Sequence, residues 1–277
     1  MATPATAPAR PILQHGDPVV EFSHVSVTFD RDPVLQDISF TVRHGEMRII
    51  LGPAGVGKSV LMKLANGLLT PDSGEIRIFG RPLSSLTPRE IYDLRAHIGM
   101  VFQESALFDS LDVEDNVAYR LHEEHVPEPE VHTRVVEALR FVELESAIDK
   151  FPSELSGGMR RRVSIARAII SDPDLILYDS PTGGLDPITS TTIIELIVKQ
   201  RDVSQTTSLL ITHRIQDAFT LATHCYNPAK GEMQPIPNGG VDPGTKFLVL
   251  NNAHIVFDGT TQELTHTTDP WLKAFTS

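Results

Sequence analysis

A glycine-rich segment in the first quarter of the chain carries the residue types that bind nucleotide phosphates. Residues 52–59 read G-P-A-G-V-G-K-S, and they lie between the apolar run Met47–Leu51 and a stretch with helical spacing of apolar residues. Glycine lets successive backbone N–H groups surround a phosphate, lysine reaches the β- and γ-phosphate oxygens, and a serine hydroxyl ligates Mg²⁺. The segment therefore predicts a site for ATP and Mg²⁺. The residues expected to form it are Gly52, Gly55, Val56, Gly57, Lys58, Ser59 and Val60.

Two further polar residues follow short apolar runs later in the chain. Residues 175–178 are a buried-strand signal that ends on Asp179, and residues 208–212 are another that ends on His213. A helix is expected between them, over about 188–199. Strands that alternate with helices favour a mainly parallel α/β core.

The segment 155–159, L-S-G-G-M, precedes a helical run in which Ser156 suits the N-cap. Alone this is only a helix start. Combined in order with the phosphate-binding loop and the Asp179 strand, it resembles the signature of ABC ATPases over about residues 19–275. The resemblance implies that two subunits meet head to tail. Ser156, Gly157 and Gly158 would then face the γ-phosphate of ATP bound to the other subunit.

The resemblance also implies roles for single residues. Phe29 resembles the aromatic that stacks on adenine, and Gln103 the glutamine that senses Mg²⁺ and the permease. Asp179 resembles the aspartate that holds Mg²⁺ through water, Asp186 a residue that crosses the dimer, and His213 the switch histidine at the γ-phosphate. Phe29 as a plain core residue, and Gln103 and His213 as ordinary polar residues, remain alternatives.

Ser180 stands where the family normally has the glutamate that polarises the attacking water. A hydroxyl is a negligible proton acceptor near neutral pH, so a rate contribution of about 10²- to 10⁴-fold is expected to be lost. Three explanations are open: a weak natural ATPase, a base supplied elsewhere, of which His213 is the candidate, and a substitution introduced to trap ATP. We prefer slow natural hydrolysis.

A finer resemblance rests on three short stretches. Residues 57–63 (G-K-S-V-L-M-K), residues 106–111 (A-L-F-D-S-L) and Met159 look like the ATP-binding subunits of MCE-linked, Mla-type lipid transporters. This implies a homodimer on the cytoplasmic face of a membrane, bound to a separate permease and with an MCE-type lipid-binding protein in the complex. An ATP-gated regulatory module with little turnover is the alternative. A soluble DNA-repair or translation cassette is disfavoured because long coiled-coil insertions and a second cassette are not seen.

The elements that must position these residues form one α/β domain over 18–277, after a flexible tail at 1–17. Alternating apolar residues at 19–29 and 34–42 predict an antiparallel β layer at its start. A helix is expected over 59–69 and an inserted helical subdomain over about 104–165, interrupted by Pro127 and Pro129. Prolines and glycines predict an irregular loop insertion at 226–245. A hairpin at 246–257 is expected to turn on Asn251 and Asn252.

Composition excludes some partners. The chain has 277 residues, with 36 acidic and 24 basic side chains and a formal net charge of -12, so nucleic acid is not expected as a partner. The single Cys225 fits a reducing compartment such as the cytoplasm. The first 17 residues lack the apolar run of a signal peptide, and no apolar stretch has the length needed to cross a bilayer.

Three other features have a bland and a functional interpretation. The basic run 160–162 with Arg167 is expected to be a solvated helix face rather than a polyanion site. The histidines near residues 122–132 are expected in an exposed acidic segment rather than a metal site. Trp271 and Phe275, near the C-terminus, suit packing on their own domain or on a second subunit, and the sequence does not decide between these.

Overall fold

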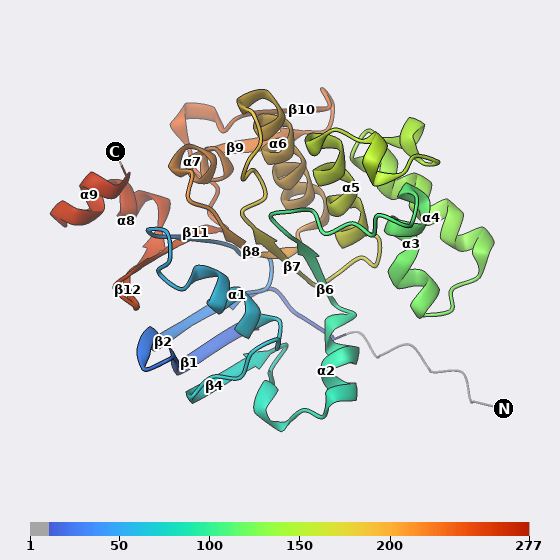
Figure 1. The fold of residues 1–277 in the computed structure, drawn as a ribbon. Helices are drawn as coiled ribbons and strands as arrows, with labels where there is room; N and C mark the ends of the chain where they lie inside the picture. Colours follow the sequence, from blue (N-terminus) through green and yellow to red (C-terminus); the bar gives the residue numbers. More distant parts are fainter. Residues whose placement is uncertain (1–10, 277) are drawn as a thin grey trace.

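The computed structural model describes residues 11–276 and begins with an antiparallel sheet (Figure 1). Its strand order is β2-β1-β4-β5. The strands are β1 (Pro18–Phe29), β2 (Asp32–Arg43), β4 (Ser73–Ile78) and β5 (Arg81–Pro82). The predicted pairing of the first two strands is confirmed, and Phe22 of β1 stacks on Phe40 of β2 with ring centroids 4.7 Å apart. The strands β4 and β5 were not predicted.

A second sheet of six strands forms the centre of the molecule. Its order is β12-β11-β3-β8-β7-β6, and all neighbours are parallel except β11 and β12. The strands are β3 (Met47–Leu51), β6 (Ile98–Val101), β7 (Leu175–Asp179), β8 (Thr207–Ile211), β11 (Thr245–Asn251) and β12 (His254–Thr260). This confirms the mainly parallel α/β core and the antiparallel layer before it.

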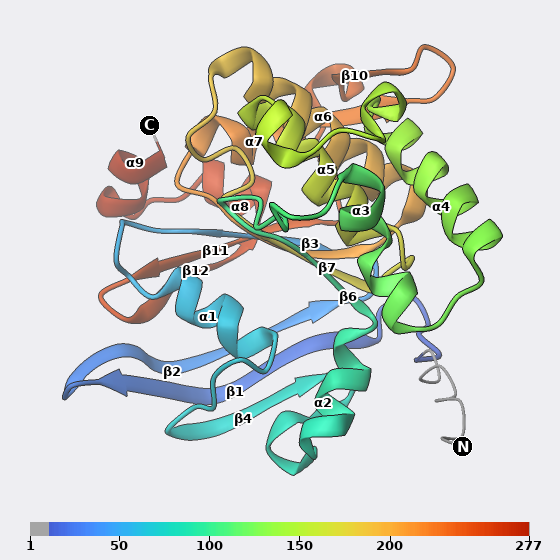
Figure 2. The same ribbon diagram turned by 45° about the vertical axis from the view of Figure 1, so that its right-hand side comes forward.

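Two hydrophobic clusters lie on the two faces of this central sheet. Ile49 and Leu51 of β3 belong to the cluster under the helices, whereas Ile50 belongs to the cluster shared with the antiparallel sheet. Both faces are covered, so the central strands are apolar without interruption. Figure 2 shows α1 (Lys58–Ala65) between the two sheets. The predicted helix 59–69 is too long, because the helix ends at Ala65 and Gly67 has a φ of 63°.

A helical lobe lies to one side of the central sheet (Figure 1). It contains α3 (Val113–Glu123), α4 (Glu128–Phe141) and α5 (Gly157–Ile169). Pro127 occupies the N-cap position of α4 and Pro129 lies in its first turn, so the break between α3 and α4 falls where the prolines are. The remaining helices are α2 (Pro88–Arg95), α6 (Pro187–Ser204), α7 (Ile215–Thr223), α8 (Thr261–Thr265) and α9 (Pro270–Thr276), with 3₁₀ turns η1 (Leu83–Ser85), η2 (Glu145–Ala147), η3 (Pro152–Glu154) and η4 (Pro237–Gly239).

The prediction of an irregular loop over 226–245 is wrong in its first part, where the chain forms regular strands. The strands β9 (His224–Asn227) and β10 (Glu232–Pro235) form an antiparallel hairpin that runs through the first part of it. Two carboxylates of α6 hold the hairpin: Glu195 accepts from the Met233 N–H at 2.8 Å, and Asp202 accepts from the Tyr226 N–H at 2.7 Å. Prolines and glycines fall in the turn and at the ends, where they do not interrupt pairing.

The hairpin of β11 and β12 is confirmed, but its turn is shifted by one residue. Asn251 belongs to β11, and the positive φ angles are at Asn252 (46°) and Ala253 (66°). The carbonyl of Ala253 accepts from the Gln36 N–H at 2.8 Å, so the turn is tied to β2. This contact explains why a residue with a Cβ is held at a positive φ angle.

Of the tail predicted at 1–17, residues 1–10 lie outside the described residues. Trp271 and Phe275 of α9 stack with centroids 5.1 Å apart and pack against the core of their own domain.

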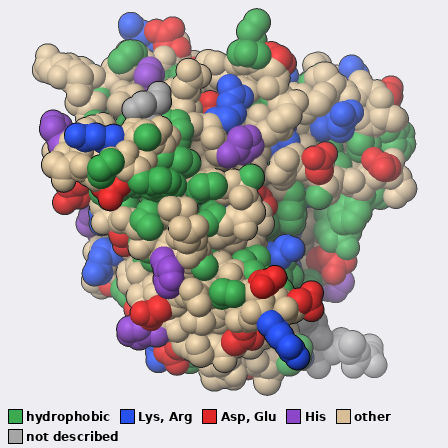
Figure 3. All heavy atoms as spheres, turned by 60° about the vertical axis from the view of Figure 1, so that its left-hand side comes forward, with side chains coloured by type: hydrophobic (Ala, Val, Ile, Leu, Met, Phe, Trp, Pro, Cys, Tyr) green, Lys and Arg blue, Asp and Glu red, His purple; other side chains and the backbone are tan. Residues whose placement is uncertain are grey.

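Hydrophobic side chains gather on the face that comes forward in Figure 3, with charged ones around them. Within residues 11–276, no helix combines the length and apolar character of a membrane span.

Candidate nucleotide-binding site

The phosphate-binding loop joins β3 to α1 and depends on three glycines with positive φ. These are Gly52 (149°), Gly55 (76°) and Gly57 (100°). A Cβ on Gly52 would lie 2.5 Å from the Leu250 carbonyl oxygen, and one on Gly57 would lie 2.8 Å from that of Val34. Gly55 has nothing within 4 Å. Packing thus requires glycine at the two ends of the loop, whereas Gly55 serves the backbone angle and leaves the loop open to a ligand.

Lys58 is the first residue of α1, and its ammonium group lies inside the loop. Its Nζ donates to the carbonyl oxygens of Gly52 and Pro53, both at 2.7 Å. Burial lowers the pKa of Lys58, and the Asp179 carboxylate counteracts this shift. Ser59 is exposed, and its hydroxyl has no hydrogen-bond partner among the described residues. A cation and a polyphosphate would therefore find a hydroxyl ligand and a lysine beside it.

Asp179 and Ser180 follow at the carboxyl end of β7. Burial raises the pKa of Asp179, while the Ser180 hydroxyl, Lys63, Lys58 and Arg161 oppose the shift. The Ser180 Oγ donates to Asp179 Oδ1 at 3.4 Å, and its backbone N–H donates to the Ile211 carbonyl of β8 at 2.9 Å. Ser180 has a φ of 47° and is buried. The neighbour of the aspartate is thus a constrained hydroxyl and not a carboxylate.

Gln103 and His213 lie just after β6 and β8, and both are exposed. A Cβ on Gly183 would lie 3.4 Å from Gln103 Cγ, so the glutamine lies against the segment that follows Ser180. No hydrogen bond within residues 11–276 joins His213 to Ser180. Because β3, β6, β7 and β8 are parallel, the residues that follow them gather at one edge of the sheet, where ligands bind in open α/β folds.

The segment 156–158 and Asp186 cap two neighbouring helices. Ser156 accepts from the Met159 N–H at 3.2 Å at the start of α5, and Asp186 accepts from the Thr189 N–H at 3.0 Å at the start of α6. The hydroxyl and the N–H of Thr189 both donate to the Asp186 carboxylate, and these hydrogen bonds lower the pKa of Asp186. A Cβ on Gly158 would lie 2.4 Å from Thr189 Cγ2, so the two helix starts are in contact. Within residues 11–276, no hydrogen bond connects them to Lys58.

Phe29 ends β1 immediately before Asp30 and Arg31, which have φ angles of 50° and 75°. Its side chain is 46% exposed, so it is not a plain core residue. An exposed ring at a strand end is free to stack on a base. Its contact with adenine stays a prediction.

The prediction that residues 160–162 and Arg167 form a solvated helix face is wrong. Arg161 is only 3% exposed, and all of these arginines donate to backbone carbonyls. The spacing of apolar residues along the helix indicates the burial of Arg161. Ile165 and Ala168 lie four and seven residues after Arg161 and are buried, so Arg161 is on the inner face of the helix.

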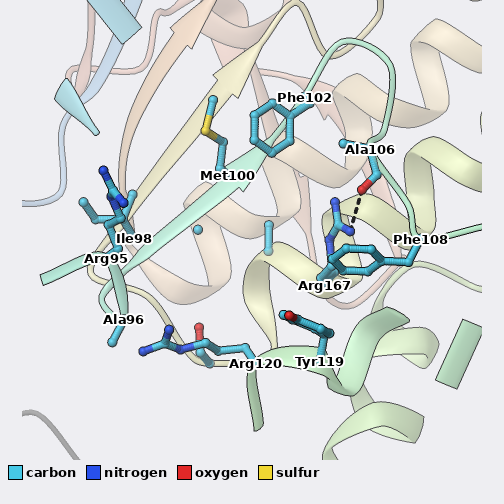
Figure 4. Close-up of a pocket in the computed structure, with 13 residues that line it drawn as sticks. Arg95, Ala96, Ile98, Met100, Phe102, Ala106, Phe108, Tyr119, Arg120 and Arg167 are labelled. Atoms are coloured by element: carbon cyan, nitrogen blue, oxygen red, sulfur yellow. Dashed lines mark hydrogen bonds between the residues drawn. The ribbon is translucent and has the colours of Figure 1, made fainter. Parts of the chain in front are cut away.

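A pocket opens between the central sheet and the helical lobe (Figure 4), and its lining includes Phe102, the residue before Gln103. Its exposed aromatic side chains are Phe102, Phe108 and Tyr119, and the last two rings are 4.7 Å apart. The Arg167 guanidinium lies over Phe108, 5.9 Å from its centroid, and donates to the Ala106 carbonyl at 2.7 Å. Sequence reasoning missed this pocket. Exposed aromatics gathered beside cations are typical of a surface that receives another protein.

The loop, the aspartate at the strand end and the capped signature helix together define a P-loop nucleotide-binding domain. The family model described as ABC transporter matches residues 35–183, and the chain belongs to this family. It is 40% identical to the intermembrane phospholipid transport system ATP-binding protein MlaF of Haemophilus influenzae over 73% of this chain and 77% of that protein. It is 36% identical to the chloroplastic protein TRIGALACTOSYLDIACYLGLYCEROL 3 of Arabidopsis thaliana, over 96% and 75%.

The fold comparison agrees. A dimeric ATP-binding cassette in a post-hydrolysis state, bound to ADP and phosphate, superposes with a TM-score of 0.73 at 27% identity. The match covers 87% of this chain and 98% of the other. The α/β fold and the family that the sequence suggested are thereby confirmed.

Proposed function

We propose that this chain is the ATP-binding subunit of a membrane lipid transporter and drives a separate permease. The observation that carries the proposal is the gathering of Lys58, Ser59 and Asp179 at one sheet edge in a chain related to a phospholipid-transport protein. Lys58 would bind the β- and γ-phosphates, and Phe29 would stack on adenine. Ser59, Gln103 and Asp179 would hold Mg²⁺, the last through water. When bound, Mg²⁺ neutralises phosphate charge.

The hydrolytic step is expected to be slow because of Ser180. Its hydroxyl already donates to Asp179 and cannot accept a proton near neutral pH. His213 is exposed after β8 and is the residue available to take that proton. Without a carboxylate beside the γ-phosphate, the ATP-bound form is expected to persist.

The ATP-bound form would be a homodimer. Ser156, Gly157 and Gly158 present the positive end of α5 on the surface of the chain, which suits a γ-phosphate held by another subunit. Asp186 would cross the same interface. The dimeric cassette that superposes on this chain supports this arrangement.

The permease would occupy the pocket lined by Phe102, Phe108 and Tyr119, at the cytoplasmic face of the membrane. Its lining offers aromatic rings for an apolar helix face and Arg167 for the carbonyls or acids at a helix end. An MCE-type lipid-binding protein would belong to the same complex. Gln103, which lies against Gly183, would relay permease position to the ATP site.

The test begins with the purified chain. Mg-ATP should convert it from monomer to dimer, measured by light scattering, and Lys58→Ala should abolish both ATP binding and dimer formation. An unchanged mass with saturating ATP would contradict the proposed dimer. Co-expression with the permease should then move the chain to the membrane fraction, and Phe108→Asp should return it to the soluble fraction while leaving ATP binding intact.

A second candidate is favoured by Ser180 alone. The chain would be an ATP-gated regulatory module whose dimer acts on a partner with little turnover. Phosphate release from the complex with its permease separates the two. Turnover stimulated by the permease supports the transporter, and an ATP-dependent dimer that releases no phosphate supports the module.

A further inference from the structure

The buried guanidinium of Arg161 contacts four backbone carbonyls. Its Nη1 donates to Ser180 O at 3.2 Å and Pro181 O at 2.9 Å. Its Nη2 donates to Gly183 O at 3.4 Å and to Gln103 O. Among the ion pairs within residues 11–276 none includes Arg161, and Glu104 and Asp179 are the carboxylates that act on its charge. The side chain is thus committed to carbonyl groups of two loops.

These loops carry the residues of the nucleotide site. Gln103 belongs to the loop beside the pocket, and Ser180 begins the turn that leads through Gly183 to Asp186. Arg161 itself lies on α5, five residues after Ser156. One side chain therefore joins the helix whose start faces a second subunit to the turn that serves the chain's own nucleotide.

The geometry of arginine suits this connection. A planar guanidinium directs several N–H groups at fixed angles, whereas lysine offers a single point charge. Charge-assisted hydrogen bonds are stronger than neutral ones, and burial leaves no water to replace them. Burial lowers the pKa of Arg161, while Glu104 and Asp179 act in the other direction. Arginine nevertheless keeps its charge in proteins.

The other side of the turn is anchored separately. The Thr182 hydroxyl donates to Asp217 Oδ2 of α7 at 2.5 Å, and both residues are buried. Arg214 Nε lies 3.4 Å from Asp217 Oδ2, and Arg214 Nη1 donates to the Ser190 hydroxyl at 2.7 Å. The turn is therefore fixed to α7 at Thr182 and to α5 through Arg161, so a shift of α5 pulls on one side only.

We propose that Arg161 is a positioning residue that transmits movement of the Ser156 end of α5 to the Ser180 turn of the same chain. The proposal rests on the proposed function, because in a head-to-tail dimer Ser156 faces one ATP and Ser180 the other. Arg161 then connects the two ATP sites. Binding at one site positions the turn at the other, which makes turnover cooperative in ATP.

Turnover is measured in the Ser180→Glu background, where the proposed function expects a measurable rate. Displacing catalytic groups by about 1 Å can cost about 10²-fold in rate. Arg161→Lys and Arg161→Gln should both lower kcat by about that factor, leave KM within about threefold, and reduce the Hill coefficient for ATP to one. Lysine should not rescue, because it keeps the charge but not the planar fork.

Arg162→Lys is the matched control. Arg162 lies on the same helix and donates to the carbonyls of Val142 and Glu143 in the helical lobe, away from the nucleotide loops. It should keep the Hill coefficient and kcat of its parent even if its Tm falls. Equal effects of the Arg161 and Arg162 variants on kcat and cooperativity would overturn the proposal.

Amide hydrogen exchange gives a readout that needs no turnover. In the native chain, Mg-ATP should slow exchange at 103–106 and 180–186. In Arg161→Lys this slowing should disappear at 180–186 while ATP still binds. Unchanged ATP-dependent protection in the variant would refute the role of Arg161. If no form of the chain releases phosphate, the proposed ATPase activity fails, and exchange alone decides the role of Arg161.

Discussion

Replacing Ser180 with glutamate tests the central chemical inference about this chain. The Ser180 Oγ lies 3.4 Å from Asp179 Oδ1, so a glutamate side chain at this position would start beside the aspartate, at the carboxyl end of β7. Its backbone already has a φ of 47°, so one residue with a Cβ replaces another there. Restoring a general base should raise kcat by about 10²- to 10⁴-fold.

The same substitution should weaken ATP binding. The new glutamate carboxylate and the γ-phosphate of ATP are like charges. At a separation of about 5 Å and an effective dielectric constant near 20, they would repel by about 3 kcal/mol. Lys58, Lys63 and Arg161 act on Asp179 with the opposite sign and offset part of this repulsion. We expect a net loss of about 1.4 to 2.8 kcal/mol, which is about 10- to 100-fold in the dissociation constant of Mg-ATP.

The assay is phosphate release by purified dimer, with ATP binding measured in parallel. Ser180→Gln is the control, because it matches glutamate in size but carries no charge and no base. It should bind ATP as tightly as the native chain and remain as slow. If native, Glu and Gln forms release phosphate at one rate, Ser180 does not occupy the position of the general base.

Three further predictions concern the phosphate-binding loop, the stacking of Phe29 on adenine and the buried hydroxyl of Thr182. Gly52→Ala should lose ATP binding and lower the free energy of unfolding by about 2 kcal/mol or more, since its Cβ would lie 2.5 Å from a β11 carbonyl oxygen. Gly55→Ala has open space around it and should lower the free energy of unfolding, measured by urea denaturation, by only about 1 kcal/mol. Phe29→Ala should weaken ATP binding by about 1–3 kcal/mol in a calorimetric titration and leave Tm unchanged, because its ring is half exposed; a matching loss of Tm would instead indicate a core role. Thr182→Val should lower the free energy of unfolding by about 1–3 kcal/mol, since it leaves the buried Asp217 carboxylate without its hydroxyl donor, and an unchanged urea midpoint would contradict that contact.

Most of the elements around the nucleotide site were predictable from local pattern. The apolar run Met47–Leu51 and the glycines after it appear where the sequence placed them, and the helix that follows begins at Lys58, one residue before its predicted start. The strand that ends on Asp179 does so as well. Chain segments of this kind are specified by their own periodicity and by the backbone angles of glycine. The strands β4 and β6 were missed because short strands with few alternating residues have a weak local signal.

Other features depend on contacts between distant segments. The hairpin of β9 and β10 is held by carboxylates of α6, so its prolines and glycines alone suggested a loop. The arginines of α5 looked like a solvated run because a charge pattern does not state which residue faces inward. Ile165 and Ala168 gave that direction for Arg161, but not its acceptors.

The sequence by itself determined that this chain has a phosphate-binding loop, an aspartate after a buried strand and a serine where a glutamate is usual. These are matters of residue type and local order. Only the tertiary structure decided that the Arg161 guanidinium reaches Gln103 and Ser180, and that Phe102, Phe108 and Tyr119 line one pocket. The physical reason is that hydrogen bonds across 19 and 58 positions of chain form only when the sheet and the helical lobe close on each other.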